Sequence, residues 1–76
     1  MKNIYLLKDL SRISGHSTPT LKFYLRIGIL QEIGRSPETN FRYFDDSTLE
    51  KLKSIRALQA QGLSLDAINQ KLSGNQ

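Results

Sequence analysis

The chain begins with apolar residues spaced as on one face of a helix. Leu6, Leu7, Leu10 and Ile13 follow this spacing, and Ser14-Gly15 is a typical helix end. The sequence therefore predicts a first helix of about two to three turns. Lys8 and Arg12, four residues apart, point away from the apolar stripe, so they are candidates for contact with an anionic partner.

A second helix is predicted from Ser17 to Ile27. Ser17 is suited to an N-cap, Pro19 lies in the first turn, and Gly28 follows where a C-terminal cap would lie. Because the two helices are joined by only a short segment around Gly15, together they form a helix-turn-helix pattern.

The second helix has two distinct faces. Leu21, Tyr24 and Leu25 occupy positions i, i+3 and i+4, so they share a face that can be buried. Another face carries a hydroxyl and two cations at every fourth position: Thr18, Lys22 and Arg26. In a helix-turn-helix this second helix is the one that enters a DNA major groove.

Two segments rich in branched and aromatic residues come next, at 29–33 and 41–44. A loop containing glycine and proline, 34–40, joins them, so the pattern predicts a β-hairpin. A hairpin directly after a helix-turn-helix is a wing. Arg35 near its tip and Arg42 in its returning strand would then be placed to reach phosphates or the edge of the minor groove.

The last part of the chain predicts two more helices. Asp45 can cap the first of them, and Ser47 to Glu50 also match an S-x-x-E capping box. This helix ends at Gly62, and the next begins with Ser64 as cap and ends at Ser73-Gly74. The expected fold class is mainly α: one winged helix-turn-helix domain over 1–76, divided into 1–28 (helix-turn-helix), 29–44 (wing) and 45–74 (supporting helices).

The net charge of +4 is concentrated in the first half of the chain. Residues 1–44 carry seven cations against three anions, whereas residues 45–76 carry four of each. This asymmetry favours a polyanionic partner, with nucleic acid first and an anionic membrane surface second. A soluble domain without a polyanionic partner is the simpler reading of the charge alone.

Composition argues against other classes of function. The chain has no cysteine and one histidine, His16, so the usual ligand set of a metal site is missing and no cofactor is expected. We find no signal-peptide pattern and no apolar run long enough to cross a bilayer, which predicts a cytoplasmic protein without a membrane partner. No nucleophile and base occur in a catalytic pattern, so no enzyme activity is expected.

An ordered series of motifs resembles the DNA-binding domain of the MerR family of bacterial transcriptional regulators. Ser17 with 20–24 and 27–30 is similar to the family's S-x-x-T-L-R-Y-Y-x-x-x-G-L-L signature, and 40–45 is similar to its wing motif N-x-Y-R-x-Y-D. Tyr5, Leu10 and Gly15 resemble the opening helix. The chain departs from the family at His16, Pro19 and Leu25, where many members have valine, arginine and glutamate.

The resemblance implies sequence-specific binding of double-stranded DNA as the N-terminal domain of a regulator. Lys22 stands at the family's arginine, Phe23 and Tyr24 at its aromatic pair, and Arg42 at its wing arginine. Adding the residues suggested by charge and helix position, the candidate DNA-binding set is Arg12, Ser17, Thr18, Thr20, Lys22, Phe23, Tyr24, Arg26, Arg35 and Arg42. We expect Tyr24 to pack mainly in the core.

The resemblance also bears on assembly. Family members continue into a long dimerising helix, so we expect a homodimer in a full-length parent and a monomer for the 76-residue chain. Two alternatives remain open at this stage: a stand-alone excisionase-like or phage DNA-binding factor, and a basic protein-interaction module.

Overall fold

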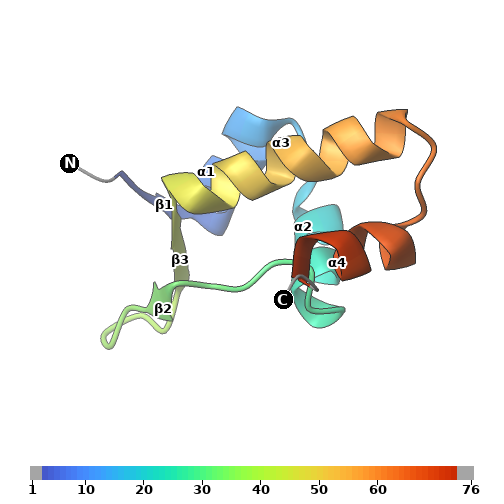
Figure 1. Ribbon diagram of the computed structural model, residues 1–76. Coiled ribbons are helices and arrows are strands. Elements are labelled where there is room, and N and C mark those ends of the chain that lie inside the picture. Colours follow the sequence, from blue (N-terminus) through green and yellow to red (C-terminus); the bar gives the residue numbers. More distant parts are fainter. Residues whose placement is uncertain (1–2, 74–76) are drawn as a thin grey trace.

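The computed structural model describes residues 3–73, which form four helices and a three-stranded antiparallel sheet (Figure 1). This arrangement is the expected winged helix-turn-helix. The elements follow in the order β1 (Ile4–Leu6), α1 (Leu7–Ser14), α2 (Thr18–Arg26), β2 (Gly34–Arg35), β3 (Arg42–Asp45), α3 (Asp46–Ala60) and α4 (Leu65–Ser73).

The two ends of α2 form as predicted. The Ser17 hydroxyl accepts a hydrogen bond from the Thr20 N–H at 3.3 Å, which satisfies one of the free donors of the first turn. After the helix, Gly28 adopts a φ of +85°, a left-handed conformation that suits glycine. The chain then turns so that the N–H groups of Ile29 and Leu30 both bond to the Tyr24 carbonyl.

This turn corrects the predicted first strand of the hairpin. Ile29 and Leu30 are not in a strand: they are 1% and 2% exposed and belong to the core. Within the hairpin, β3 pairs with β2, and β2 lies in the segment that was predicted to be a loop. Pairing begins at the Ile33 N–H, which donates to the Tyr43 carbonyl, and the connecting turn is correspondingly shorter than expected.

A strand that the sequence reading missed completes the sheet. Leu6 was predicted to be helical, but it ends β1 and precedes α1, and its N–H donates to the Asp9 carboxylate at 3.0 Å. β1 pairs with β3 in antiparallel register, with Tyr5 opposite Phe44. The sheet order is β1-β3-β2, so β3 is the central strand of the wing.

Of the two predicted starts of α3, the cap at Asp45 is confirmed and the capping box at Ser47 is not. Asp45 is the N-cap, and its carboxylate accepts a hydrogen bond from the Ser47 N–H at 3.0 Å. The capping box that would begin at Ser47 does not form, because Ser47 already lies in the first turn. Ser64 accepts from the Ala67 N–H at 3.2 Å as predicted. The predicted end at Gly74 lies outside the described residues.

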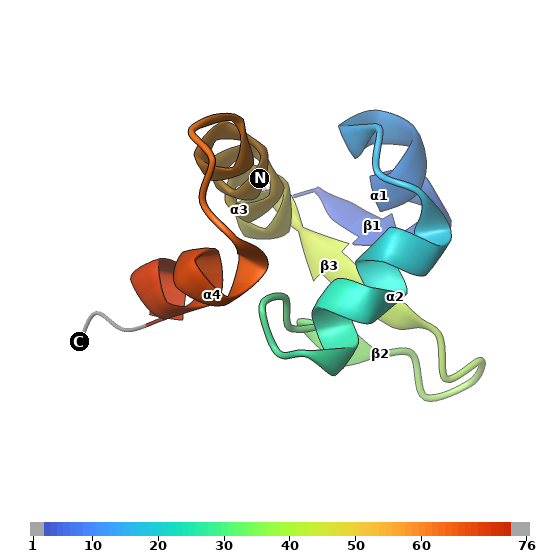
Figure 2. The same ribbon diagram turned by 90° about the vertical axis from the view of Figure 1, so that its right-hand side faces the viewer.

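The core lies where the helices meet the sheet. The side chains of the core are contributed by α1, α2, the segment after α2, β3, α3 and α4, and the fully buried ones are Leu10, Leu21, Ile29, Leu30, Phe44, Leu52, Ile55 and Ile68. α3 packs against α1, and α4 packs against α3. In the view of Figure 2, α2 and the hairpin lie on one side of the molecule and α3 and α4 on the other.

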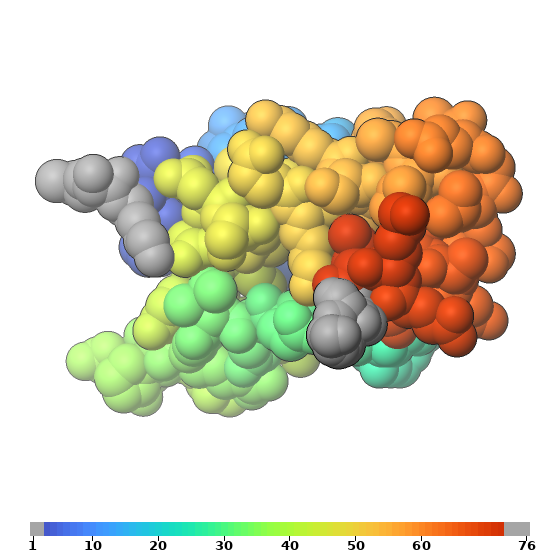
Figure 3. Space-filling model, viewed as in Figure 1, coloured from blue at the N-terminus to red at the C-terminus, as the bar shows by residue number. Residues whose placement is uncertain are grey.

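The hairpin projects from this core. Figure 3 shows its light-green loop extending at one end of the molecule, below the body formed by the helices. Gly34 leaves room for the ring of Tyr43, its partner on β3, because a Cβ atom added there would lie 2.6 Å from Cζ of that ring. Within residues 3–73 no helix is long and apolar enough to span a bilayer.

Candidate nucleic-acid interface

An open hollow between α2 and the wing is lined by cations from both elements. Lys22 and Arg26 come from α2, and Arg35 and Arg42 come from β2 and β3. Lys22 and the two wing arginines also line an adjoining hollow, together with Thr18. Five of the ten candidate residues therefore line these two adjoining hollows: Thr18, Lys22, Arg26, Arg35 and Arg42.

The hydroxyl-and-cation face of α2 is accessible at its C-terminal end. The guanidinium of Arg26 lies over the ring of Phe23, with its Cζ atom 5.3 Å from the ring centroid. The Phe23 ring is 37% exposed, so it presents apolar surface beside a cation. Such a pair can contact both a phosphate and a thymine methyl group.

Two of the candidate hydroxyl groups are engaged in capping. Besides accepting from the Thr20 N–H, the Ser17 hydroxyl donates to the Thr20 hydroxyl at 2.9 Å. Neither side chain lines the hollows. Their primary role in this structure is to begin α2, which in turn fixes the direction in which Thr18 and Lys22 point.

Three other candidates, Phe23, Tyr24 and Arg12, line neither hollow. Tyr24 is 3% exposed, as expected for a core residue, and its ring packs edge-on against His16 with the centroids 5.8 Å apart. Arg12, on α1, is exposed and lies 3.6 Å from an oxygen of Asp9. Neither Tyr24 nor Arg12 joins the cations between α2 and the wing.

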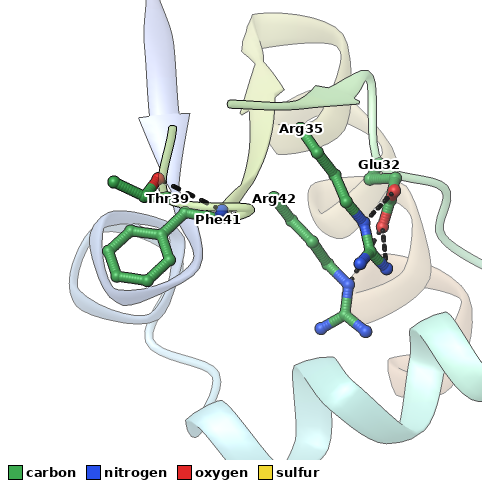
Figure 4. A network of polar contacts seen from close by, with 5 residues as sticks. All are labelled: Glu32, Arg35, Thr39, Phe41 and Arg42. Atoms are coloured by element: carbon green, nitrogen blue, oxygen red, sulfur yellow. Dashed lines mark hydrogen bonds and ion pairs between the residues drawn. The ribbon is translucent and has the colours of Figure 1, made fainter. Parts of the chain in front are cut away.

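The wing arginines share one carboxylate. Glu32 accepts from Arg35 Nε at 2.8 Å and from Arg42 Nε at 2.9 Å (Figure 4). The hydrogen bond from Arg35 is the main reason why the pKa of Glu32 lies below its ordinary value, and the contacts with Arg42 lower it further. The same carboxylate raises the pKa of Arg35. The ionised form of Glu32 is therefore favoured beside the charged guanidinium of Arg35.

A hollow between a helix and a hairpin, lined by cations from both, is the geometry of a nucleic-acid surface. Among the described residues no three side chains of histidine, cysteine, aspartate or glutamate gather closely enough to hold a metal ion. A family model described as "MerR HTH family regulatory protein" matches residues 5–75. The chain belongs to this family of helix-turn-helix regulatory proteins.

A curated relative is also described as a regulator. The "Multidrug-efflux transporter 1 regulator" of Bacillus subtilis (strain 168) is 28% identical over 65 residues, which cover 86% of this chain and 23% of that protein. The chain thus spans about a quarter of this curated relative.

Solved structures of transcriptional regulators share the fold. SkgA from Caulobacter crescentus superposes with a TM-score of 0.86 at 29% identity, covering 96% of this chain and 52% of that one. HiNmlR is described as a MerR family regulator lacking the sensor domain and bound to promoter DNA. It superposes with a TM-score of 0.78 at 31% identity, covering 90% of this chain and 51% of that one. A MerR family regulator from Bacillus cereus superposes with a TM-score of 0.87 over 97% of this chain and 55% of that one. At 18% identity this likeness shows the fold alone.

Several residues that line the hollows between α2 and the wing were absent from the candidate DNA-binding set. Lys8, Asn40 and Phe41 line the hollow next to Thr18. Lys8 had a sequence signal, its spacing to Arg12. Asn40 has a positive φ of 61°, and Phe41 is 58% exposed, but neither property can be read from the sequence without knowing where the hairpin turns. Glu32 was missed because its role depends on strand pairing.

Proposed function

We propose that this chain binds double-stranded DNA, with α2 in the major groove and the wing on the neighbouring sugar-phosphate backbone. The observation that supports this most strongly is the placement of Lys22 and Arg26 opposite Arg35 and Arg42 across one hollow. A major groove about 12 Å wide admits a helix, and cations on a flanking hairpin can then reach phosphates. The promoter complex of HiNmlR supports the same partner.

The side chains divide into two proposed roles. Lys22, Arg35 and Arg42 contact phosphates and so position the domain without reading sequence. Thr18, Phe23 and Arg26 face base edges from α2. Ser17 and Thr20 support these contacts by capping the helix, Tyr24 supports them from the core, and Arg12 contributes to the positive field at longer range.

The proposal extends to the protein that contains this domain. We infer a regulator of transcription in the bacterial cytoplasm, in which two copies of the domain read two half-sites related by the two-fold symmetry of a homodimer. The 76 residues act as one DNA-binding domain, with a binding and not a catalytic role. A single domain would bind weakly, with a dissociation constant of roughly 10⁻⁴ to 10⁻⁶ M at physiological salt.

The dependence of affinity on salt tests this function. Each neutralised phosphate contributes about 0.9 to the slope of log affinity against log salt, so about four to six contacts predict a slope of roughly −3.5 to −5.5. Fluorescence anisotropy of a labelled mixed-sequence duplex from about 50 to about 200 mM salt measures it. No binding at the lowest salt would reject the proposal and would favour a basic module that docks on an acidic protein.

A further inference from the structure

The wing places two arginines directly opposite each other. Arg35 on β2 and Arg42 on β3 are Cα partners in the antiparallel register. Like charges at facing positions of a strand pair repel, so a nearby anion stabilises this arrangement. In this structure the anion is the carboxylate of Glu32, which lies at the end of the segment leading into β2.

The carboxylate engages the two guanidiniums differently. Arg35 donates from Nε to Oε2 at 2.8 Å and from Nη2 to Oε1 at 3.4 Å, so it holds both oxygens. Arg42 donates only from Nε, to Oε1 at 2.9 Å. Its two terminal nitrogens bond to nothing within residues 3–73, and Figure 4 shows them pointing toward α2. One anionic group thus bridges two cations and leaves donors available on one of them.

A DNA phosphate has the same chemistry as this carboxylate: paired anionic oxygens that accept charge-assisted bonds from guanidinium groups. We propose that Arg35 and Arg42 form an anion site for a phosphate of the DNA backbone, and that Glu32 occupies this site in the free protein. Binding then transfers at least one guanidinium from Glu32 to the phosphate. Glu32 thereby lowers the affinity of the wing for any duplex. This inference rests on the proposed DNA-binding function.

The location of the site supports a phosphate as the competing anion. Glu32, Arg35 and Arg42 line the same hollow as Lys22 and Arg26 of α2. The Glu32 side chain is 31% exposed and the two arginine side chains are 43% and 38% exposed, so all three can be reached from solvent. A phosphate next to a groove occupied by α2 would meet the terminal nitrogens of Arg42 first.

Substitution of Glu32 by glutamine tests the competition. Glu32→Gln keeps the shape of the side chain but removes the charge that holds the arginines. Glu38→Gln is the matched control, because it removes one charge from the same hairpin at a residue whose only side-chain hydrogen bond within residues 3–73 comes from the Ser36 hydroxyl, at 3.4 Å. We expect Glu32→Gln to bind a mixed-sequence duplex on the order of two- to fivefold more tightly than Glu38→Gln, the range expected for an exposed ion pair.

A second background separates local competition from long-range charge. In a protein that carries Arg35→Ala and Arg42→Ala, Glu32→Gln should raise the affinity for the duplex only as much as Glu38→Gln does, because no arginine remains to be released. Circular dichroism of each variant verifies that the helices are intact. Equal or weaker binding by Glu32→Gln in the otherwise unchanged protein would overturn the proposal. Absence of binding by the unchanged protein would instead overturn the proposed function, and this inference with it.

Discussion

Lys22 on α2 and Arg42 on β3 line the same hollow, although they belong to different parts of the chain. The core produces this relationship, because Leu21, the residue before Lys22, and Phe44, which shares a strand face with Arg42, are both fully buried. Burial of these two side chains fixes the rotation of the helix and the face of the strand. The cations are therefore held in position by the apolar residues beside them.

Replacing either cation should weaken binding to all duplexes alike. For Lys22→Ala and Arg42→Ala we expect losses of about tenfold, equivalent to about 1.4 kcal/mol, with the salt slope shallower by about 0.9. Lys53→Ala is the control, because Lys53 lies on α3 and lines a different hollow. Affinities for two unrelated duplexes would check this expectation, and a loss confined to one of them would mean that the altered residue reads bases.

Phe23 should contribute without carrying charge. Its ring supports the guanidinium of Arg26 and offers exposed apolar surface. We expect Phe23→Ala to weaken binding by about threefold or more, in the range of a cation–π contact, while the salt slope stays the same. The slope distinguishes this result from loss of a phosphate contact. Affinity equal to that of the unchanged protein would show that Phe23 does not face the DNA.

The wing should be sensitive to a single methyl group at Gly34. A Cβ there would lie within 3 Å of Oη and Cζ of Tyr43, so in Gly34→Ala the Tyr43 ring must move or the two strands must separate. We expect a loss of about 1–3 kcal/mol in the free energy of unfolding, as for other overpacked positions. Hydrogen exchange at the Ile33 N–H, which bonds to the Tyr43 carbonyl, would report the local effect. Unchanged protection there, together with an unchanged free energy of unfolding, would contradict close packing of the Tyr43 ring over Gly34.

His16 should make stability depend on pH near neutrality. Burial, and then the charge of Arg56, lower the pKa of His16 from its ordinary value of 6.5. Arg56 approaches Nδ1 at 3.5 Å, and Lys53 lines the same hollow. The unfolded chain therefore binds a proton more readily than the folded one, so stability is fully present above the ordinary pKa and falls as the pH drops toward the folded pKa.

Urea midpoints at about pH 7.5 and about pH 5.5 measure this effect. His16 is the only histidine, so His16→Gln should reduce the difference between the two midpoints. A midpoint that rises on acidification in the unchanged protein would contradict the lowered pKa.

The helices could be predicted from the sequence because their signals are local. Ser17, Gly28 and the apolar spacing of Leu21 and Tyr24 each act within a few residues, so the bounds of α2 followed from the chain alone. The spacing of four residues between Thr18, Lys22 and Arg26 likewise placed them on one face of the predicted helix. The family resemblance added the wing arginine Arg42 at a matching position.

The sheet was harder to predict because its pairing is not local. β1 has three residues and β2 has two, too few to show a period, and both depend on β3 for their hydrogen bonds. Ile29 and Leu30 have the composition of a strand, yet the turn at Gly28 directs them into the core. The register that sets Arg35 opposite Arg42 brings Glu32 to both, which no sequence pattern indicated.

Titration of the ¹⁵N-labelled protein with a duplex at low salt tests the central claim most directly. The account predicts that amide signals from Thr18 to Arg26, together with those of Arg35 and Arg42, shift on addition of DNA, while those on the far face of α3 remain in place. Unmoved signals in α2 and the wing, or shifts confined to α3 and α4, would contradict it.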